Sequence, residues 1–292
     1  MTLIELKDGE KIATQGPFDL AKNSSIKIGG FSERAYFPTS ISQMQKTLVF
    51  LEEAEIPYYV LGNMSNVLPA DGRLSRQVIS TKKMTGAQIG RDVFVEAGIT
   101  SGSFLNLCRL SGKSGAEFLA GIPCTIGGAL YMNAGVNGKY VAEIVKEVCF
   151  LRENQLIRLP VSKCEYSYKN SLFMRENAVI VGATFSLAES TSIKVKENIN
   201  DYLSRRAHLP VGKSMGCVFK NPKGFSAGEL IERCNLKGLR FGGAYVSEKH
   251  ANFIMNDGTS TAQDVKTLIE KIRKTVYENY KILLEEEIRY LN

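Results

Sequence analysis

Hydrophobic and polar positions along the chain change their spacing several times, which predicts alternating helices and strands. Met44, Leu48 and Leu51 recur at the spacing of one helix face and predict an early helix. The apolar run 58–61 ends at Gly62, so it predicts a short strand that is closed by a tight turn.

The remainder of the chain continues this mixture. Extended apolar runs predict strands over residues 91–98, 141–151, 155–161, 178–190, 217–219 and 250–256. Helices are predicted from Ser101, over 191–210, over 226–236 and from Thr261, with a glycine-punctuated loop over 119–138. The last helix carries an apolar stripe of Val265, Leu268, Ile269, Ile272 and Val276. The predicted fold class is α+β.

Length and charge set broad limits on function. A chain of 292 residues is long enough for two domains, or three small ones, with hydrophobic cores. The net charge of +7 fits phosphate-bearing small molecules as well as nucleic acid. Because the basic residues are spread along the sequence, the charge alone does not predict a nucleic-acid binder.

Cysteine and histidine usage indicates a reducing compartment and no metal site. The six cysteines form no CxxC pair, and the chain has only two histidines. The opening residues are too polar for a signal peptide. The uncharged stretch 119–138 contains five glycines and a proline, so it is rejected as a membrane helix. We expect a cytoplasmic protein.

Two loops have the composition of a ligand site. The turn Gly62–Asn66, "GNMSN", can present backbone N–H groups to a phosphate, although taken alone it is more often an ordinary strand-ending turn. The stretch 121–135 holds four glycines among apolar residues, which lets backbone approach a flat hydrophobic ring. The alternative for this stretch is a tightly packed turn between core elements. The stretch 121–135 does not match a GxGxxG dinucleotide fingerprint.

The stretch 215–222, "MGCVFKNP", places a cysteine beside a lysine and an amide. An arbitrary cysteine is most often a small buried hydrophobe. Lys220, Asn221 and the later stretch 242–253 favour a polar pocket around Cys217 instead. The run Glu285–Glu287 has a plain alternative explanation as solvated surface charge.

Taken in order, these stretches resemble the UDP-N-acetylenolpyruvoylglucosamine reductase family, in its shorter type. The resemblance covers nearly the whole chain and is carried by "KIGG", "LGNMSNVL", "GAEFLAGIPCTIGGALYMNAG", "YSYKNSLF", "MGCVFKNP", "GLRFGGAYVSEKHANFIMNDG" and "LEEEIRY". It implies a two-part FAD-binding domain of the vanillyl-alcohol-oxidase type, over 1–84 and 85–189, and a substrate-binding domain over 190–292.

The resemblance also implies the chemistry and the cofactor site. NADPH would reduce FAD, and the enolpyruvyl group of UDP-N-acetylglucosamine enolpyruvate would then receive a hydride and a proton, giving UDP-N-acetylmuramate for peptidoglycan. The protein would act as a monomer on this small molecule. FAD would lie against Gly62, Asn63, Met64, Ser65, Asn66, Ile122, Pro123, Thr125, Gly127 and Gly128.

Three residues would carry catalysis. Cys217 stands where the family usually has a serine that donates the proton, and a thiol is the stronger acid. Glu287 would polarise the enolpyruvyl group or relay the proton. Lys169, in place of a usual arginine, would stabilise the enolate-like charge.

The remaining implied residues bind substrate or depart from the family pattern. Tyr168, Lys220, Asn221 and His250 are the implied substrate-binding residues. Met64 and Cys124 stand where glycine is usual. These departures leave a second interpretation open, in which the protein is a divergent paralogue that binds flavin or UDP-sugar with altered or lost activity. A nucleic-acid binder and another oxidase of the same flavin fold are the further alternatives.

Overall fold

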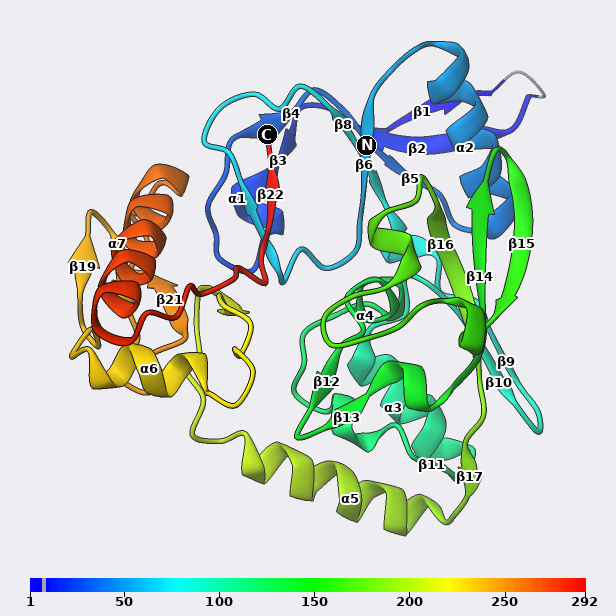
Figure 1. The fold of residues 1–292 in the computed structure, drawn as a ribbon. Helices are drawn as coiled ribbons and strands as arrows, with labels where there is room; N and C mark the ends of the chain where they lie inside the picture. Colours follow the sequence, from blue (N-terminus) through cyan, green and yellow to red (C-terminus); the bar gives the residue numbers. More distant parts are fainter. Residues whose placement is uncertain (7–8) are drawn as a thin grey trace. The chain divides into compact units, whose positions relative to one another are not determined.

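The chain forms two compact units, each built from segments that are separated in sequence. The structure is a computed structural model that describes residues 1–6 and 9–292. Unit 1 comprises Met1–Gly16, Arg34–Asn63 and Gln77–Ala207, and unit 2 comprises Pro17–Glu33, Met64–Arg76 and His208–Asn292. The chain path through both is shown in Figure 1.

The first sheet of unit 1 has five strands in the order β1, β2, β5, β8, β6. Their bounds are Thr2–Glu5, Lys11–Gln15, Ala35–Phe37, Gln77–Ser80 and Tyr58–Leu61. β1, β2 and β5 pair antiparallel, whereas β8 pairs parallel with both β5 and β6. The predicted early helix is α2 (Ile41–Glu53), which Ser40 caps through its side chain.

The second sheet of unit 1 is antiparallel, in the order β15, β14, β16, β10, β9. Its strands are Gln155–Pro160, Val145–Arg152, Val179–Phe185, Val93–Glu96 and Ala87–Ile89. Successive residues of β14 alternate between two buried clusters, Val148 and Phe150 in one and Cys149 and Leu151 in the other. Because both faces of the sheet are covered, its central strands read as continuous apolar runs.

Helices and short elements complete unit 1. The helices are α3 (Ser101–Leu110), α4 (Ile126–Tyr131) and α5 (Ser192–Arg205). Two-residue strands pair as β11 (Lys113–Ser114) with β17 (Ala188–Glu189) and as β12 (Gly135–Val136) with β13 (Lys139–Tyr140). The 3-10 turns are η1 (Thr81–Lys83), η2 (Glu117–Leu119), η3 (Val141–Glu143), η4 (Val161–Lys163) and η5 (Leu172–Met174).

The main body of unit 2 is a four-stranded antiparallel sheet with two helices packed against it. The strands, in the order β18, β21, β20, β19, are Ser214–Cys217, Phe253–Asn256, Ala244–Val246 and Arg240–Phe241. The helices are α6 (Ala227–Arg233) and α7 (Ala262–Tyr280). Short pairs join β22 (Arg289–Leu291) to β7 (Val67–Pro69) and β3 (Phe18–Asp19) to β4 (Phe31–Ser32), next to α1 (Leu20–Asn23).

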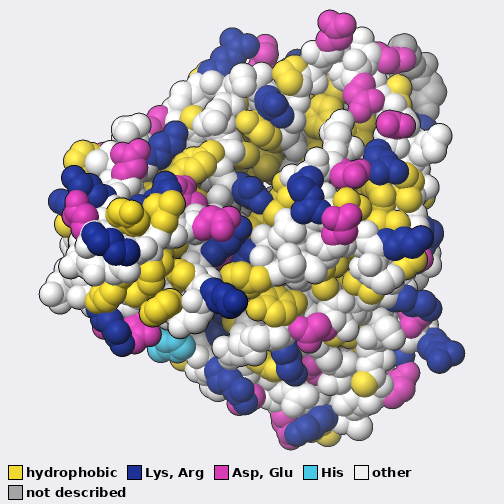
Figure 2. Space-filling view, in the orientation of Figure 1, with side chains coloured by type: hydrophobic (Ala, Val, Ile, Leu, Met, Phe, Trp, Pro, Cys, Tyr) yellow, Lys and Arg dark blue, Asp and Glu magenta, His cyan; other side chains and the backbone are white. Residues whose placement is uncertain are grey.

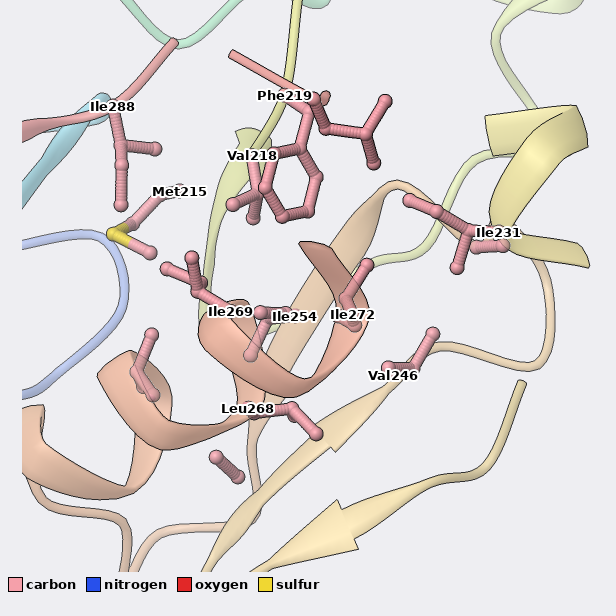
Figure 3. Packing of buried hydrophobic residues seen from close by; sticks show 14 of the residues in the cluster. Met215, Val218, Phe219, Ile231, Val246, Ile254, Leu268, Ile269, Ile272 and Ile288 are labelled. Carbon is pink, nitrogen blue, oxygen red and sulfur yellow. The ribbon is translucent and has the colours of Figure 1, made fainter. Parts of the chain in front are cut away.

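The core of unit 2 lies between α7 and the strand that carries Cys217. All five residues of the predicted apolar stripe on α7 are buried. Figure 3 shows Ile269 and Ile272 of α7 on the side of Val218 and Phe219, and Leu268 belongs to the same buried cluster. Packing against α7 therefore fixes the position and direction of Val218 and Phe219, which directly follow Cys217.

Most expected elements are confirmed, and the α+β class with them. Ser226 caps α6, and Thr261 with Asp264 forms the capping box of α7. The long loop expected over 119–138 is partly wrong, because it contains α4. Thr125 caps that helix, and small residues allow it to begin next to β10.

The predicted three-part division of the chain stays a prediction. Helix α5, which that division assigns to the third domain, lies in unit 1. In the part of the chain that the structure describes, no helix combines the length and the apolar character needed to span a membrane.

Candidate active site

In unit 1, the two predicted flavin loops touch each other. Asn63 donates its side-chain amide N–H to the carbonyl oxygen of Pro123, at 2.8 Å. The backbone of Gly62 lies so close to Thr125 that an added Cβ would sit 2.1 Å from the Thr125 hydroxyl oxygen. Gly62 is therefore required by close packing between the loops.

The second loop is held by its own hydrogen bonds. The Ser101 hydroxyl donates to the carbonyl of Ile122 at 2.5 Å, and the Gly127 N–H donates to Ala97 at 2.9 Å. A Cβ at Gly127 would lie 2.9 Å from that of Ala97, so this glycine serves packing. At Gly128 the nearest atom to such a Cβ is the Thr125 hydroxyl at 3.5 Å, which leaves its surface open to a ligand.

Met64 keeps the backbone conformation that a glycine would adopt. Its φ is +53°, in the left-handed region, and its side chain is buried. The backbone N–H groups of Met64, Ser65 and Asn66 donate to no acceptor within residues 1–6 and 9–292. Successive N–H groups around a left-handed residue form an anion-binding nest. This donor set fits a phosphate of FAD.

Cys124 is a buried thiol in unit 1. Burial raises its pKa to about 11, so the thiol is neutral at physiological pH. Its carbonyl accepts a hydrogen bond from the Ser101 N–H at 3.0 Å. The side chain that replaces the usual glycine is thus packed inside unit 1 and adds no charge to the flavin loop.

We expect Gly62→Ala to lower thermal stability and FAD retention. The added methyl group must displace Thr125, which caps α4, at an overpacking cost of about 1–3 kcal/mol. Thermal unfolding and the FAD-to-protein ratio after gel filtration measure both effects. Gly102→Ala is the matched control, because an added Cβ there meets no atom within 4 Å. Wild-type stability and FAD content in Gly62→Ala would contradict the packing argument.

In unit 2, Cys217 ends strand β18 at an irregular point of the sheet. It pairs with Phe253 of β21, and the register shifts between Ser214 and Cys217. Gly216 within this bulge has φ +77°, which glycine adopts without strain. Cys217 is half-buried, whereas Cys108, Cys124, Cys149 and Cys164 are buried. Cys234 is half-buried too, so partial exposure alone does not single out Cys217, and its catalytic role stays a prediction.

The backbone brings Glu287 beside Cys217. The Glu287 N–H donates to the carbonyl of Val218 at 2.8 Å, and Phe219 forms an antiparallel bridge with Glu286. The side-chain amide of Asn66 donates to the carbonyl of Glu287 at 3.1 Å. Three predicted site residues that are distant in sequence thus share one corner of unit 2.

The predicted substrate-binding residues of unit 2 already have protein contacts. Lys220 pairs with Glu285 at 2.5 Å, and the Asn221 side-chain oxygen accepts from the Ala227 N–H at 3.0 Å, at the start of α6. His250 Nδ1 accepts from the Asn252 N–H at 3.2 Å. Burial, and to a lesser degree His208, lowers the pKa of His250, which favours the neutral imidazole. Their roles in binding stay predictions.

The remaining predicted residues lie on a tight turn of unit 1. Ser167 and Asn170 exchange two backbone hydrogen bonds, at 3.1 and 3.2 Å, and Tyr168 with Lys169 form the tip. Lys169 has φ +51°. The Tyr168 ring packs edge-on against Tyr140 with 6.3 Å between centroids. The catalytic role of Lys169 stays a prediction.

Sequence analysis did not identify Asn252, which holds the two residues after Cys217 through hydrogen bonds. The buried Asn252 accepts from the Phe219 N–H at 2.9 Å and donates to the Phe219 carbonyl at 2.8 Å. The backbone carbonyl of Asn252 accepts from the Val218 N–H at 2.9 Å. The only sequence signal is its place in "HANF", since a polar residue inside an apolar run needs a buried partner.

The explanation of Glu285–Glu287 as solvated charge holds for Glu285, whose side chain is 72% exposed, and is wrong for Glu286, whose side chain is 20% exposed. Glu285 pairs with Lys220, and Glu286 accepts from both Arg273 and Tyr290. These pairings are tertiary, so a charge count along the sequence does not reveal them.

Charge on the visible surface is mixed. On the face drawn in Figure 2, dark blue Lys and Arg side chains are interspersed with magenta Asp and Glu side chains on each unit. This distribution differs from the basic stripe of a nucleic-acid-binding surface.

Comparison with known proteins agrees with this geometry. The family model "UDP-N-acetylenolpyruvoylglucosamine reductase, C-terminal domain" matches residues 207–291, and the model "FAD binding domain" matches residues 33–154. The first contains Cys217 and Glu287, and the second contains both flavin loops.

Curated relatives and a solved structure cover nearly the whole chain. The UDP-N-acetylenolpyruvoylglucosamine reductase of Geobacter metallireducens is 38% identical over 92% of this chain and 91% of its own. That of Clostridium perfringens is 34% identical over 98% and 95%. The crystal structure of the Thermus caldophilus enzyme superposes with a TM-score of 0.82 at 28% identity, covering 96% of this chain and 99% of that one.

These findings confirm the predicted fold class, an FAD-binding domain of the vanillyl-alcohol-oxidase type followed by a substrate-binding domain, and with it the expectation of FAD. The chain belongs to the UDP-N-acetylenolpyruvoylglucosamine reductase family.

Proposed function

We propose that this protein reduces UDP-N-acetylglucosamine enolpyruvate to UDP-N-acetylmuramate, with NADPH as the reductant and Cys217 as the proton donor. Family membership makes it an FAD-dependent oxidoreductase of peptidoglycan synthesis. The observation that carries the finer assignment is the pairing of the chain around Cys217 with that around Glu287 in unit 2. We expect a cytoplasmic monomer.

The residues that would hold FAD are those of the two loops. In unit 2, the N–H groups of Met64, Ser65 and Asn66 suit a phosphate. Within unit 1, taken by itself, the open surface at Gly128 admits a close approach of a ligand. When bound, FAD supplies the transfer of a hydride from the nicotinamide to C3 of the enolpyruvyl group. Asn63 and Thr125 keep the loops together in unit 1.

Cys217 supplies the proton of the reduction. Addition of a hydride to C3 converts the carbon–carbon double bond into an enolate-like group that must take a proton at C2. The Cys217 S–H bond breaks, the proton goes to C2, and the thiolate left behind regains a proton from solvent. A thiol is the better general acid than an alcohol near neutral pH because its ordinary pKa lies closer to that pH.

Glu287 would assist from the adjacent segment. Its backbone is held through Val218 and Asn66, so the carboxylate starts from a fixed point next to Cys217. From there we assign it the polarisation of the enolpyruvyl group or the relay of the proton. Lys169 is assigned to the enolate charge, and Tyr168, Lys220, Asn221 and His250 to substrate binding, on family resemblance.

The test is NADPH oxidation by purified, FAD-supplemented protein with and without UDP-N-acetylglucosamine enolpyruvate. We expect oxidation that depends on this substrate, with one product molecule per NADPH consumed. A protein that holds FAD yet shows no substrate-dependent oxidation would contradict the proposal and favour the divergent paralogue. Salt-sensitive binding to DNA or RNA would instead favour the nucleic-acid alternative.

A further inference from the structure

Side chains of α7 and β22 form hydrogen bonds with Glu286, the residue before Glu287. Arg273 of α7 donates to one carboxylate oxygen of Glu286 at 3.2 Å, and the Tyr290 hydroxyl donates to the other at 2.5 Å. The Arg273 and Glu286 side chains are only 36% and 20% exposed. The arrangement is thus partly desolvated, and charge-assisted hydrogen bonds there hold their geometry better than surface pairs do.

The network reaches the site through the backbone of the C-terminal segment. Glu286 forms the bridge to Phe219, whose side chain is buried in the unit 2 core. On either side of this bridge, Lys220 N–H donates to Glu285 and Glu287 N–H donates to Val218, both at 2.8 Å. Successive residues of an extended segment point to opposite sides, so anchoring Glu286 to α7 turns Glu287 away from that helix.

Three further contacts hold the same segment. Ile288 is buried and packs in the core near Met215, as Figure 3 shows. The Arg289 N–H donates to the carbonyl of Asn66 at 3.0 Å, where β22 begins to pair with β7. Lys266 of α7 lies over the Tyr290 ring, 5.3 Å from its centroid. Tyr290 therefore links the strand that follows Glu287 to the helix that holds Glu286.

We propose that Glu286, tied to Arg273 and Tyr290, is a positioning residue that holds Glu287 against the strand carrying Cys217. This rests on the proposed function, since it assigns Arg273, Glu286 and Tyr290 to the alignment of two catalytic groups. None of the three is itself assigned a contact with substrate. Burial and the bond to Glu286 raise the pKa of Tyr290, so the hydroxyl stays protonated and able to donate at physiological pH.

The test removes one hydroxyl group from the network. Tyr290→Phe keeps the ring and should slow substrate-dependent turnover about tenfold in kcat, with KM changed less than about twofold, because misalignment affects the reacting geometry more than binding. Reduction of the bound flavin by NADPH should be unchanged, and its re-oxidation by the enolpyruvyl substrate should slow by the same factor. Glu286→Gln should show the same split.

Hydrogen exchange of the FAD-free protein gives a second readout. In Tyr290→Phe the amides of Glu287 and Arg289 should exchange faster, while those of α7 stay protected. Tyr58→Phe is the matched control, because it also removes a tyrosine–carboxylate bond, to Glu52 at 3.2 Å, in unit 1.

The outcomes separate this inference from the proposed function. If the reduced flavin of the wild-type protein is not re-oxidised by the substrate, the proposed function fails. Hydrogen exchange alone then decides whether Glu286 positions Glu287. If wild-type protein turns over and both Tyr290→Phe and Glu286→Gln keep its kcat and exchange rates, the positioning role is overturned. A parallel loss of thermal stability and flavin reduction would also overturn it, because that result indicates a general structural defect.

Discussion

Replacing Cys217 with alanine should lower kcat by about 10²- to 10⁴-fold while FAD remains bound. That range is the usual contribution of a general acid, and alanine has no proton to give. The substitution is small, at a half-buried residue at the end of β18, so the sheet of unit 2 should persist. Steady-state NADPH oxidation measures the loss of kcat, and the flavin absorbance of the purified variant measures the FAD that remains bound.

Two variants control the cysteine experiment. Cys217→Ser restores a proton-donating hydroxyl, and we expect it to recover most of the activity that alanine loses. Cys234→Ala removes another half-buried cysteine of unit 2, at the end of α6, and should leave kcat unchanged. If Cys217→Ala turns over at the wild-type rate, the proton comes from another group.

Replacing Glu287 with glutamine should lower kcat by about 10²-fold, the lower end of the range for a proton-transferring residue. The amide has nearly the same size, and the bonds from Glu287 to Val218 and Asn66 use its backbone N–H and carbonyl, which the substitution leaves in place. The lost property is the negative charge. Binding of FAD and thermal stability should therefore match the wild type, which calorimetry and absorbance check.

Glu278→Gln is the control for loss of a carboxylate charge. Glu278 is an exposed residue of α7 whose pair with Lys274 spans 3.9 Å, and such surface pairs contribute about 0–1 kcal/mol. It should behave as the wild type in both assays. Equal turnover in Glu287→Gln and Glu278→Gln would exclude a catalytic role for the Glu287 charge.

Local patterns predicted much of the secondary structure because the forces concerned act within a few residues. The helical spacing of Val265, Leu268 and Ile272 predicted α7, and the helix starts expected at Ser226 and Thr261 are the N-caps that the structure contains. The loop over 119–138 failed because glycine and proline are usual loop signals. Here Gly127 instead lets α4 approach Ala97 closely.

Motif order in the sequence determined the family, and with it FAD and the candidate residues Cys217 and Glu287. Tertiary structure alone decided which of these residues meet. Asn66, Cys217 and Glu287 are separated by long stretches of chain, yet backbone pairing brings them to one corner of unit 2. The Asn252 clamp and the Arg273–Glu286–Tyr290 network are likewise tertiary, because a hydrogen bond depends on distance in space and leaves no periodic mark in sequence.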